Sequence, residues 1–282
     1  MSKNIIPPPR DVYIRAGASV VGTKESEGPL GNSFDVCDAS DDKFGADTWE
    51  KAESEMQRKA LATALVKAKL ADDDLDLLAA GDLLNQCVGS NYGLLSFDVP
   101  YIGLYGACST AAEGLMIASL LCGSSVKRCA SVSSSHNCSA ERQFRFPLEY
   151  GGQRTPTSQW TVTGSGALII TSEKSDFSRL NCKSEYIPKV TDVLPGCALD
   201  YGITDINNMG AAMAPAAADT LMRYLKASQT EPKDYDLILS GDLGAEGASI
   251  LSDLLSENGY DLSGVYRDCG LMIYDRETQD VH

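Results

Sequence analysis

Two ten-residue segments that lie far apart in this 282-residue chain carry nearly the same sequence. Residues 74–83 read DLDLLAAGDL and residues 234–243 read DYDLILSGDL, with six identical positions. Each copy is predicted to follow a helix and to precede another, and the two copies are offset by 160 residues. That offset is too long for a solenoid repeat and has the size of a duplicated half-protein. A chance recurrence of a common strand-and-turn pattern is the alternative.

A second pair of segments supports the duplication. Residues 99–108 have a counterpart in residues 265–274, where a repeated half would place it. Counted from the repeated strand, the first copy extends over 95 residues and the second over only 46. We therefore expect two halves, residues 1–174 and residues 175–282, of which the second lacks a helix and two strands. Either the chain is a fragment or the mature protein is naturally cut, and both alternatives stay open.

Strand and helix patterns alternate along the first half, which predicts an α/β fold. A long segment with the capping candidates Asp47 and Thr48 before it is typical of a helix. The stretch over residues 137–159 is polar and aromatic without clean periodicity, so we expect a long ordered loop, a kind that is usually functional. The expected strands are residues 12–21, 75–80, 100–105, 129–135 and 162–171, and the expected helices are residues 49–69 and a segment that ends at Leu121.

Composition limits the classes of function. A formal net charge of −15 argues against binding to nucleic acid and against direct adsorption to anionic lipid. The chain has no run of about eighteen apolar residues and its start, MSKNIIPPPR, is unlike a signal peptide, so we expect an intracellular protein. Two histidines are too few for a histidine-based metal site, and nine cysteines that fit no zinc motif are expected to be reduced thiols. The acidic stretch over residues 34–55 lacks EF-hand spacing and is expected to be a solvated loop and helix start.

Cys108 is the strongest candidate for a functional residue. It lies between a predicted buried strand and a helix that begins with small residues, in the run Gly106-Ala107-Cys108-Ser109-Thr110. The unpaired amides and the dipole at a helix start favour a thiolate, which makes the thiol nucleophilic. The same amides are suited to bind a carboxylate. A small buried core cysteine is the other interpretation of this residue.

Several polar residues are expected at the same edge of the sheet as Cys108, because parallel strands end on one edge and ligands bind there. His136 and Asn137 follow one predicted strand, and Asp82, Asn85 and Gln86 follow another. For His136 three roles stay open: a base, a hydrogen-bond donor to an anion, or a strand-end histidine satisfied by the protein itself.

Two arginines in the expected loop, Arg142 and Arg145, are suited to bind a carboxylate because guanidinium groups do so through two hydrogen bonds. Surface ion pairs to Glu141 or Glu149 are the alternative for each of them.

The chain resembles the thiolase and ketoacyl-synthase superfamily in its two halves, its cysteine before a helix and its Gly-x-Gly-Ala run before a later strand. Within that superfamily it resembles the stage V sporulation protein AD family of spore-forming bacteria, through the segments AGDLLNQ, YGACST, SSSHNCSAERQFRFPLEYGGQ, TVTGSGA, DYGITDINNMGAAMAPAAADT and DLILSGDLG. The resemblance covers nearly the whole chain. It implies a thiolase-like α/β fold of duplicated βαβαβαββ halves in an α/β/α/β/α layering, with the second half incomplete.

The superfamily resemblance places Cys108 at the nucleophile position of condensing enzymes. Those enzymes also use a histidine and a further His or Asn from the second half to stabilise the thioester oxyanion. The segment that would carry the histidine reads Ser240-Gly241-Asp242-Leu243-Gly244 and has none, and His282 is terminal. This departure argues against condensation, so we expect a protein that is not an enzyme. An acyltransferase that uses Cys108 as its nucleophile is the alternative.

The family resemblance implies a protein that binds dipicolinic acid, or its calcium chelate, during loading of the developing spore. Such a flat dicarboxylate needs donors at both ends, and the expected ligand-binding residues are Asp82, Asn85, Cys108, His136, Asn137 and Arg142. No cofactor and no metal ligand are expected, with calcium present only as part of the chelate. The resemblance also implies a location peripheral to the spore inner membrane, membrane-protein partners encoded in the same operon, and a possible homodimer. An interaction scaffold without a small ligand is a third hypothesis.

Overall fold

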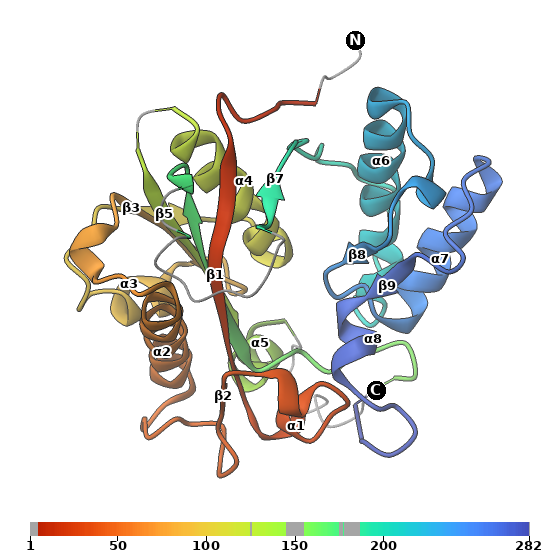
Figure 1. Ribbon diagram of the computed structural model, residues 1–282. Coiled ribbons are helices and arrows are strands. Elements are labelled where there is room, and N and C mark those ends of the chain that lie inside the picture. Colours follow the sequence, from red (N-terminus) through yellow and green to blue (C-terminus); the bar gives the residue numbers. More distant parts are fainter. Residues whose placement is uncertain (1–4, 125, 145–154, 175–176, 178–186, 282) are drawn as a thin grey trace. The chain divides into compact units, whose positions relative to one another are not determined.

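The computed structural model describes residues 5–124, 126–144, 155–174, 177 and 187–281 (Figure 1). These residues form two compact units. The large unit contains the described residues of 7–144 and 161–193, and the small unit contains those of 5–6, 155–160 and 194–281. These units are defined by contacts and not by internal similarity, so they do not test the expected duplicated halves. Residues 1–174 and 175–282 as duplicated halves stay a prediction.

The large unit is built on one mixed β-sheet. Strands β3, β4 and β5 are parallel to one another, and β6 is antiparallel to both of its neighbours, β1 and β5. The short strand β7 pairs with β1. The strand order is β2 (Val36–Cys37), β1 (Val12–Val21), β6 (Gly164–Thr171), β5 (Arg128–Ser135), β3 (Leu77–Asp82) and β4 (Tyr101–Leu104), with β7 at Lys189–Val190.

Helices pack on both faces of this sheet. Because strand side chains alternate between faces, Leu78 of β3 packs with the buried residues of α2 (Trp49–Ala68), whereas Leu77 packs with those of α4 (Thr110–Cys122). The remaining helices of the large unit are α1 (Thr23–Ser26), α3 (Val88–Gly93) and α5 (Asn137–Phe144), with 3-10 turns at Gly31–Ser33, Asp72–Asp74 and Ala107–Ser109.

The boundaries of α2 have local causes. The side chain of Thr48, one of the two predicted caps, accepts the backbone N–H of Lys51 at 3.3 Å. The helix ends at Ala68, because the cap residue Lys69 after it has a left-handed φ of +52° that stops further helical bonding. The predicted helix over residues 49–69 is therefore confirmed.

The small unit consists of a helix pair packed on a short parallel sheet. Its core joins α6 and α7 with Ile238 of β8 and Tyr266 of β9. The elements are α6 (Met209–Ser228), a 3-10 turn (Pro232–Asp234), β8 (Ile238–Ser240), α7 (Gly244–Glu257), β9 (Tyr266–Asp268) and α8 (Cys269–Ile273).

Several elements recur at or near the 160-residue offset. Helix α2 at residues 49–68 corresponds to α6 at 209–228, and the 3-10 turn at 72–74 corresponds to that at 232–234. Both helices end in a left-handed residue, and in both turns an aspartate accepts the backbone N–H three residues before it. The parallel pair β3–β4 likewise corresponds to β8–β9. Because a helix, a turn and a strand pair all correspond, a chance recurrence of one strand pattern does not account for the similarity.

One predicted element is wrong. Residues 137–144, expected to begin a long loop, form helix α5. Their polar composition concealed a helix whose buried face is made of small residues, Asn137, Ser139 and Ala140. The remainder of the expected loop falls partly on residues 145–154, which lie outside the described residues.

Candidate ligand-binding site

Three parallel strands bring the predicted site residues to one edge of the large sheet. Strand β3 lies between β5 and β4, so the carboxyl ends of all three strands lie together. Asp82 is the last residue of β3, Cys108 follows β4, and His136 follows β5. Adjacent strands are about 4.8 Å apart, so Cys108 and His136 belong to loops on either side of Asp82.

Cys108 lies in the turn that leads into α4. It is the middle residue of the 3-10 turn Ala107–Ser109 and its side chain is exposed. Ala107, just before it, has a left-handed φ of +47°, a conformation that costs free energy in a residue with a Cβ. Ser109 precedes α4 without a side-chain cap bond. The thiol is therefore displayed at a helix start that no side chain caps, as the sequence predicts.

Asp82 is buried and closes the loop that follows β3. Its two oxygens accept the backbone N–H groups of Gln86 at 3.2 Å, Cys87 at 3.2 Å and Gly89 at 3.1 Å. Because these bonds occupy the carboxylate, Asp82 acts by positioning the loop. Within that loop Asn85 is exposed in a left-handed conformation, with φ at +61°. The loop thus presents the amide of Asn85 to solvent.

His136 is buried and hydrogen-bonded within the protein, and is not exposed as a ligand-binding residue would be. The ring is 1% exposed and lies 5.2 Å from the ring of Trp49 between centroids. Nε2 is 2.9 Å from the carbonyl oxygen of Asp42, and Nδ1 accepts the N–H of Cys138 at 3.2 Å. Burial lowers the pKa of His136. With both ring nitrogens bonded inside the protein, the role of a satisfied strand-end histidine fits best.

Asn137 and Arg142 both belong to α5. Asn137 is 8% exposed and its backbone N–H donates to Thr163 Oγ1 at 3.0 Å. Arg142 is more than half exposed and its guanidinium pairs with Glu50 of α2. The surface ion pair expected as the alternative therefore exists, with a partner other than the two acids that the sequence suggested. Arg145, the second arginine considered, lies outside the described residues.

A buried polar network behind Asp82 escaped the sequence analysis. Glu53 and Gln57, one turn apart on α2, are 1% and 0% exposed. Ser134 Oγ donates to Glu53 Oε1 at 2.7 Å, and Gln57 Nε2 is 3.1 Å from the carbonyl oxygen of Gly81. The sequence did contain a signal for this network. Glu53 and Gln57 share a helix face with the apolar residues Ala52, Met56 and Ala60, and that spacing indicates burial.

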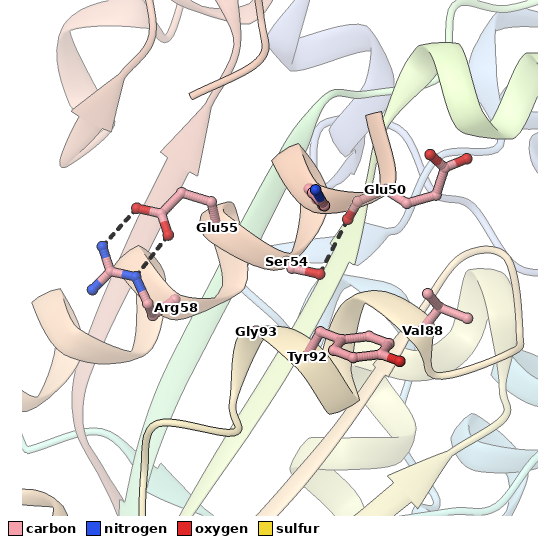
Figure 2. Close-up of a pocket in the computed structure, with 8 residues that line it drawn as sticks. Glu50, Ser54, Glu55, Arg58, Val88, Tyr92 and Gly93 are labelled. Carbon is pink, nitrogen blue, oxygen red and sulfur yellow. Dashed lines mark hydrogen bonds and ion pairs between the residues drawn. The ribbon is translucent and has the colours of Figure 1, made fainter. Parts of the chain in front are cut away.

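A surface groove of about 370 Å³ lies between α2 and α3 (Figure 2). Figure 2 shows Tyr92 and Val88 from α3 on one side and the Glu55–Arg58 ion pair from α2 nearby. None of the predicted site residues lines this groove, although Glu50, which does, is the partner of Arg142. The groove is lined by Glu50, Lys51, Ser54, Glu55, Arg58, Val88, Tyr92 and Gly93.

The described residues contain neither a metal site nor a helix able to cross a membrane. No group of three or more histidine, cysteine, aspartate or glutamate side chains is arranged there to hold a metal ion. In the same part of the chain no helix combines the length and the apolar character that crossing a membrane requires.

Comparison with known proteins places the chain in a family. Residues 6–282 match the family described as Stage V sporulation protein AD. The chain belongs to the stage V sporulation protein AD family. One member, Stage V sporulation protein AD of Bacillus subtilis (strain 168), is 42% identical over 269 residues, which cover 95% of this chain and 76% of that protein. The family identity supports a role in sporulation.

The solved structures similar to this family member include a 3-ketoacyl-CoA thiolase and a 3-oxoacyl-(acyl carrier protein) synthase. Human mitochondrial 3-ketoacyl-CoA thiolase is 11% identical with a TM-score of 0.55, over 94% of this chain and 86% of that one. The 3-oxoacyl-(acyl carrier protein) synthase III of Pseudomonas aeruginosa PAO1 is 11% identical with a TM-score of 0.53, over 88% and 80%. At such identities the likeness shows the fold alone, and it confirms the thiolase-like α/β fold.

Proposed function

We propose that this protein binds dipicolinic acid, or its calcium chelate, for uptake into the developing spore through a degenerate thiolase-type site. One observation carries the proposal: Cys108 is exposed at a helix start that no side chain caps, while His136, the histidine of the same sheet edge, is buried with both nitrogens bonded. His136 is thereby removed from chemistry at the thiol. His282 lies outside the described residues.

The donors at this edge suit a flat dicarboxylate. A helix start without a side-chain cap favours an anion such as a carboxylate through the helix dipole. The exposed amides of Asn85 and Gln86, on the loop after the neighbouring strand, are donors for the second carboxylate. Arg142 is a further donor if it exchanges Glu50 for the ligand. In this proposal Asp82, His136 and Asn137 do not touch the ligand. They hold the backbone of the loops at this sheet edge in place.

Charge favours the chelate over the free acid. The protein carries a formal charge of −15, and Glu113 adds a carboxylate in the first turn of α4, next to the Cys108 turn. These charges repel a free dianion, whereas a calcium chelate without net charge feels little of the field. We therefore expect calcium to raise the apparent affinity for dipicolinate.

Calorimetric titration tests the proposal. Dipicolinate is titrated into wild type with equimolar calcium and, separately, with a calcium chelator. We expect binding that is tighter with calcium and about tenfold weaker in Cys108→Ala and in Asn85→Gly, which keeps the left-handed backbone and removes the amide. Cys37→Ala and Asn91→Ala, at other exposed positions, serve as controls. A flat titration under both conditions contradicts the proposal and favours an interaction scaffold. Equal affinity with and without calcium contradicts the chelate.

Arg142→Ala is the informative variant for the third donor. A loss of affinity supports exchange of Glu50 for the ligand, and unchanged affinity assigns Arg142 to its surface ion pair. Exposed pairs of this kind stabilise a protein by at most about 1 kcal/mol, so the variant is expected to stay folded.

A second candidate function is acyl transfer through Cys108. The observation that favours it is the strained turn at Ala107, because left-handed residues of this kind gather at active sites. It predicts a thioester at Cys108 after incubation with an acyl-CoA, seen as an added acyl mass that Cys108→Ala abolishes. Absence of the adduct argues for a binding site without chemistry.

The proposed setting is the periphery of the spore inner membrane, where membrane proteins of the same operon would receive the ligand. A homodimer is proposed through the edge strand β4, which among the described residues pairs only with β3 and exposes Tyr101 and Ile102. Sedimentation of wild type and Ile102→Lys tests the dimer, and a concentration-independent monomer in wild type contradicts it.

A further inference from the structure

Glu53 lies inside the large unit, where an ionised carboxylate is costly. It is 1% exposed and projects from α2 toward the carboxyl ends of β3 and β5. Ser134 Oγ of β5 is 2.7 Å from one oxygen, and Ser139 Oγ of α5 is 3.4 Å from the other. Two hydroxyl groups are weak compensation for a buried charge, because a charge in the interior needs a counter-ion or several strong donors.

The carboxyl groups of Glu53 and Asp82 both lie close to Gly89. A Cβ placed on Gly89 would be 3.5 Å from Glu53 Cδ and 3.7 Å from Asp82 Oδ2. Asp82 accepts three backbone N–H groups. Two negative charges this close in a buried site repel each other strongly.

No cation balances this pair within the described residues that face it. On α5 the guanidinium of Arg142 pairs with Glu50, one turn before Glu53 on α2. On the β3–α3 loop, on β4 and directly after β4, the titratable Cys87, Tyr101 and Tyr105 lie near Asp82. From β5 only the hydroxyl of Ser134 reaches Glu53, and on α2 itself the next polar neighbour is the uncharged Gln57. The single charge that faces Glu53 is that of Asp82, and it is repulsive.

Gln57, one turn from Glu53 on α2, has a buried acceptor without a partner among the described residues. Its Nε2 is shared among Gly81 O, Ser90 Oγ and Ser134 Oγ, at 3.1, 3.0 and 2.7 Å. Its Oε1 is buried without a hydrogen-bond partner in the described structure. Residues four apart on a helix are neighbours on one face. A protonated Glu53 would bring a donor to the region where this acceptor lacks one.

We propose that Glu53 is a positioning residue that sets the ligand-binding loop through Asp82: uncharged, it lets Asp82 hold the loop closed, and ionised, it loosens that loop. The loop in question, residues 83–87 and the start of α3 that follows it, carries Asn85 and Gln86, so ligand affinity falls as pH rises through the neutral range. The inference rests on the proposed function for its ligand, although the loop itself responds without one.

Burial, together with the charge of Asp82, raises the pKa of Glu53 to about 7 from an ordinary 4.5. The change of state therefore falls in the neutral range. Carboxylates of a free ligand, with pKa values near 4, are ionised throughout that range. Burial lowers the pKa of His136 below its ordinary value, and its contribution cancels when wild type is compared with Glu53→Gln.

The test compares wild type, Glu53→Gln and Glu55→Gln. Gln keeps the size of Glu53 and its acceptor for Ser134 while it removes the titration. Glu55 is the matched control, because it lies on the same helix but its pKa is lowered by Arg58. Dipicolinate with calcium is titrated from about pH 6 to about pH 8. We expect about a tenfold loss of affinity in wild type and in Glu55→Gln and a flat profile in Glu53→Gln. A flat wild-type profile, or a Glu53→Gln profile as steep as wild type, overturns the inference.

A measurement without ligand separates this inference from the proposed function. Protection factors for amide exchange at Gln86, Cys87 and Gly89 report whether the Asp82 bonds are closed. We expect these factors to fall several-fold over the same pH range in wild type and to stay constant in Glu53→Gln. If no variant binds dipicolinate but this pattern appears, the proposed ligand is wrong, while the effect of Glu53 ionisation on the loop is supported. Constant protection factors in wild type overturn the inference that Glu53 controls the loop, whether or not dipicolinate binds.

Discussion

Gly81 lies so close to Leu104 that a Cβ on Gly81 would be 2.4 Å from the carbonyl oxygen of Leu104. The same Cβ would be 2.8 Å from Cγ2 of Thr110, the first residue of α4. Gly81 thus sets how closely β3 approaches β4 and the start of α4. Asp82, next in sequence, and Cys108, between Leu104 and Thr110, depend on that spacing.

Gly81→Ala is therefore expected to destabilise the protein and to weaken ligand binding together. Because the nearest atom belongs to the backbone, it cannot rotate away, and we expect a loss of about 1–3 kcal/mol in the free energy of unfolding. Urea unfolding measures it. Gly166→Ala is the control, since nothing lies within 4 Å of its Cβ and a change within about 0.5 kcal/mol is expected. Equal stability of the two variants would contradict the assigned role of Gly81.

Asp82→Ala is expected to cost about 3 kcal/mol of unfolding free energy, because it leaves three loop amides without their acceptor. Asp82→Asn keeps one acceptor oxygen and should lose less. Chemical denaturation gives both values, with the exposed Asp73→Ala as control. Should Asp82→Ala retain wild-type stability, the loop is held by other contacts and Asp82 has no positioning role.

Glu53 is expected to make stability depend on pH. Its pKa in the folded protein, about 7, exceeds the ordinary 4.5, so the folded state holds the proton more tightly than the unfolded state. The resulting stabilisation is complete below pH 4.5, is lost as pH rises toward 7 and is absent above, with a total of up to about 3 kcal/mol. His136 acts in the opposite sense, because its pKa is lowered and its burial favours the neutral ring.

The measured quantity is therefore the difference between wild type and Glu53→Gln in unfolding free energy, followed over that pH range. His136 cancels in this difference. We expect the Gln variant to gain on wild type as pH rises and to level off near neutrality. A difference that does not change with pH would show that Glu53 ionises as an ordinary exposed carboxyl.

The sheet edge could be predicted from the sequence because it depends on chain direction alone. Once residues 77–82, 101–104 and 128–135 form parallel strands, their ends meet, and Asp82, Cys108 and His136 come to one edge. The 160-residue repeat was visible for a similar reason, since the turn aspartates Asp74 and Asp234 make local bonds that need their own side chains.

Side-chain direction at that edge could not be predicted, because it depends on contacts distant in sequence. The ring of His136 turns to the carbonyl of Asp42, 94 residues away, and no local pattern marks that pairing. Glu53 was overlooked because acids in the first turns of a helix usually face solvent and favour the dipole. Its buried carboxyl is bonded by Ser134, which lies 81 residues later in the chain.

Thiol reactivity provides a final prediction that joins the fold to the proposed ligand. Cys108 and Cys37 are exposed, whereas Cys87, Cys122 and Cys129 are buried. The neighbouring Cys129 and burial raise the pKa of the Cys122 thiol, which suppresses its thiolate. We expect iodoacetamide to modify Cys108 and Cys37 in the native protein and the three buried thiols only after unfolding, as peptide mass spectrometry would show.

Dipicolinate with calcium should slow the modification of Cys108 several-fold and leave that of Cys37 unchanged, because only Cys108 lies at the proposed site. Slower modification of both thiols would indicate an effect of the ligand on the reagent. An unchanged rate at Cys108 under saturating ligand would place the bound molecule away from the start of α4, and the sheet edge would then no longer be its site.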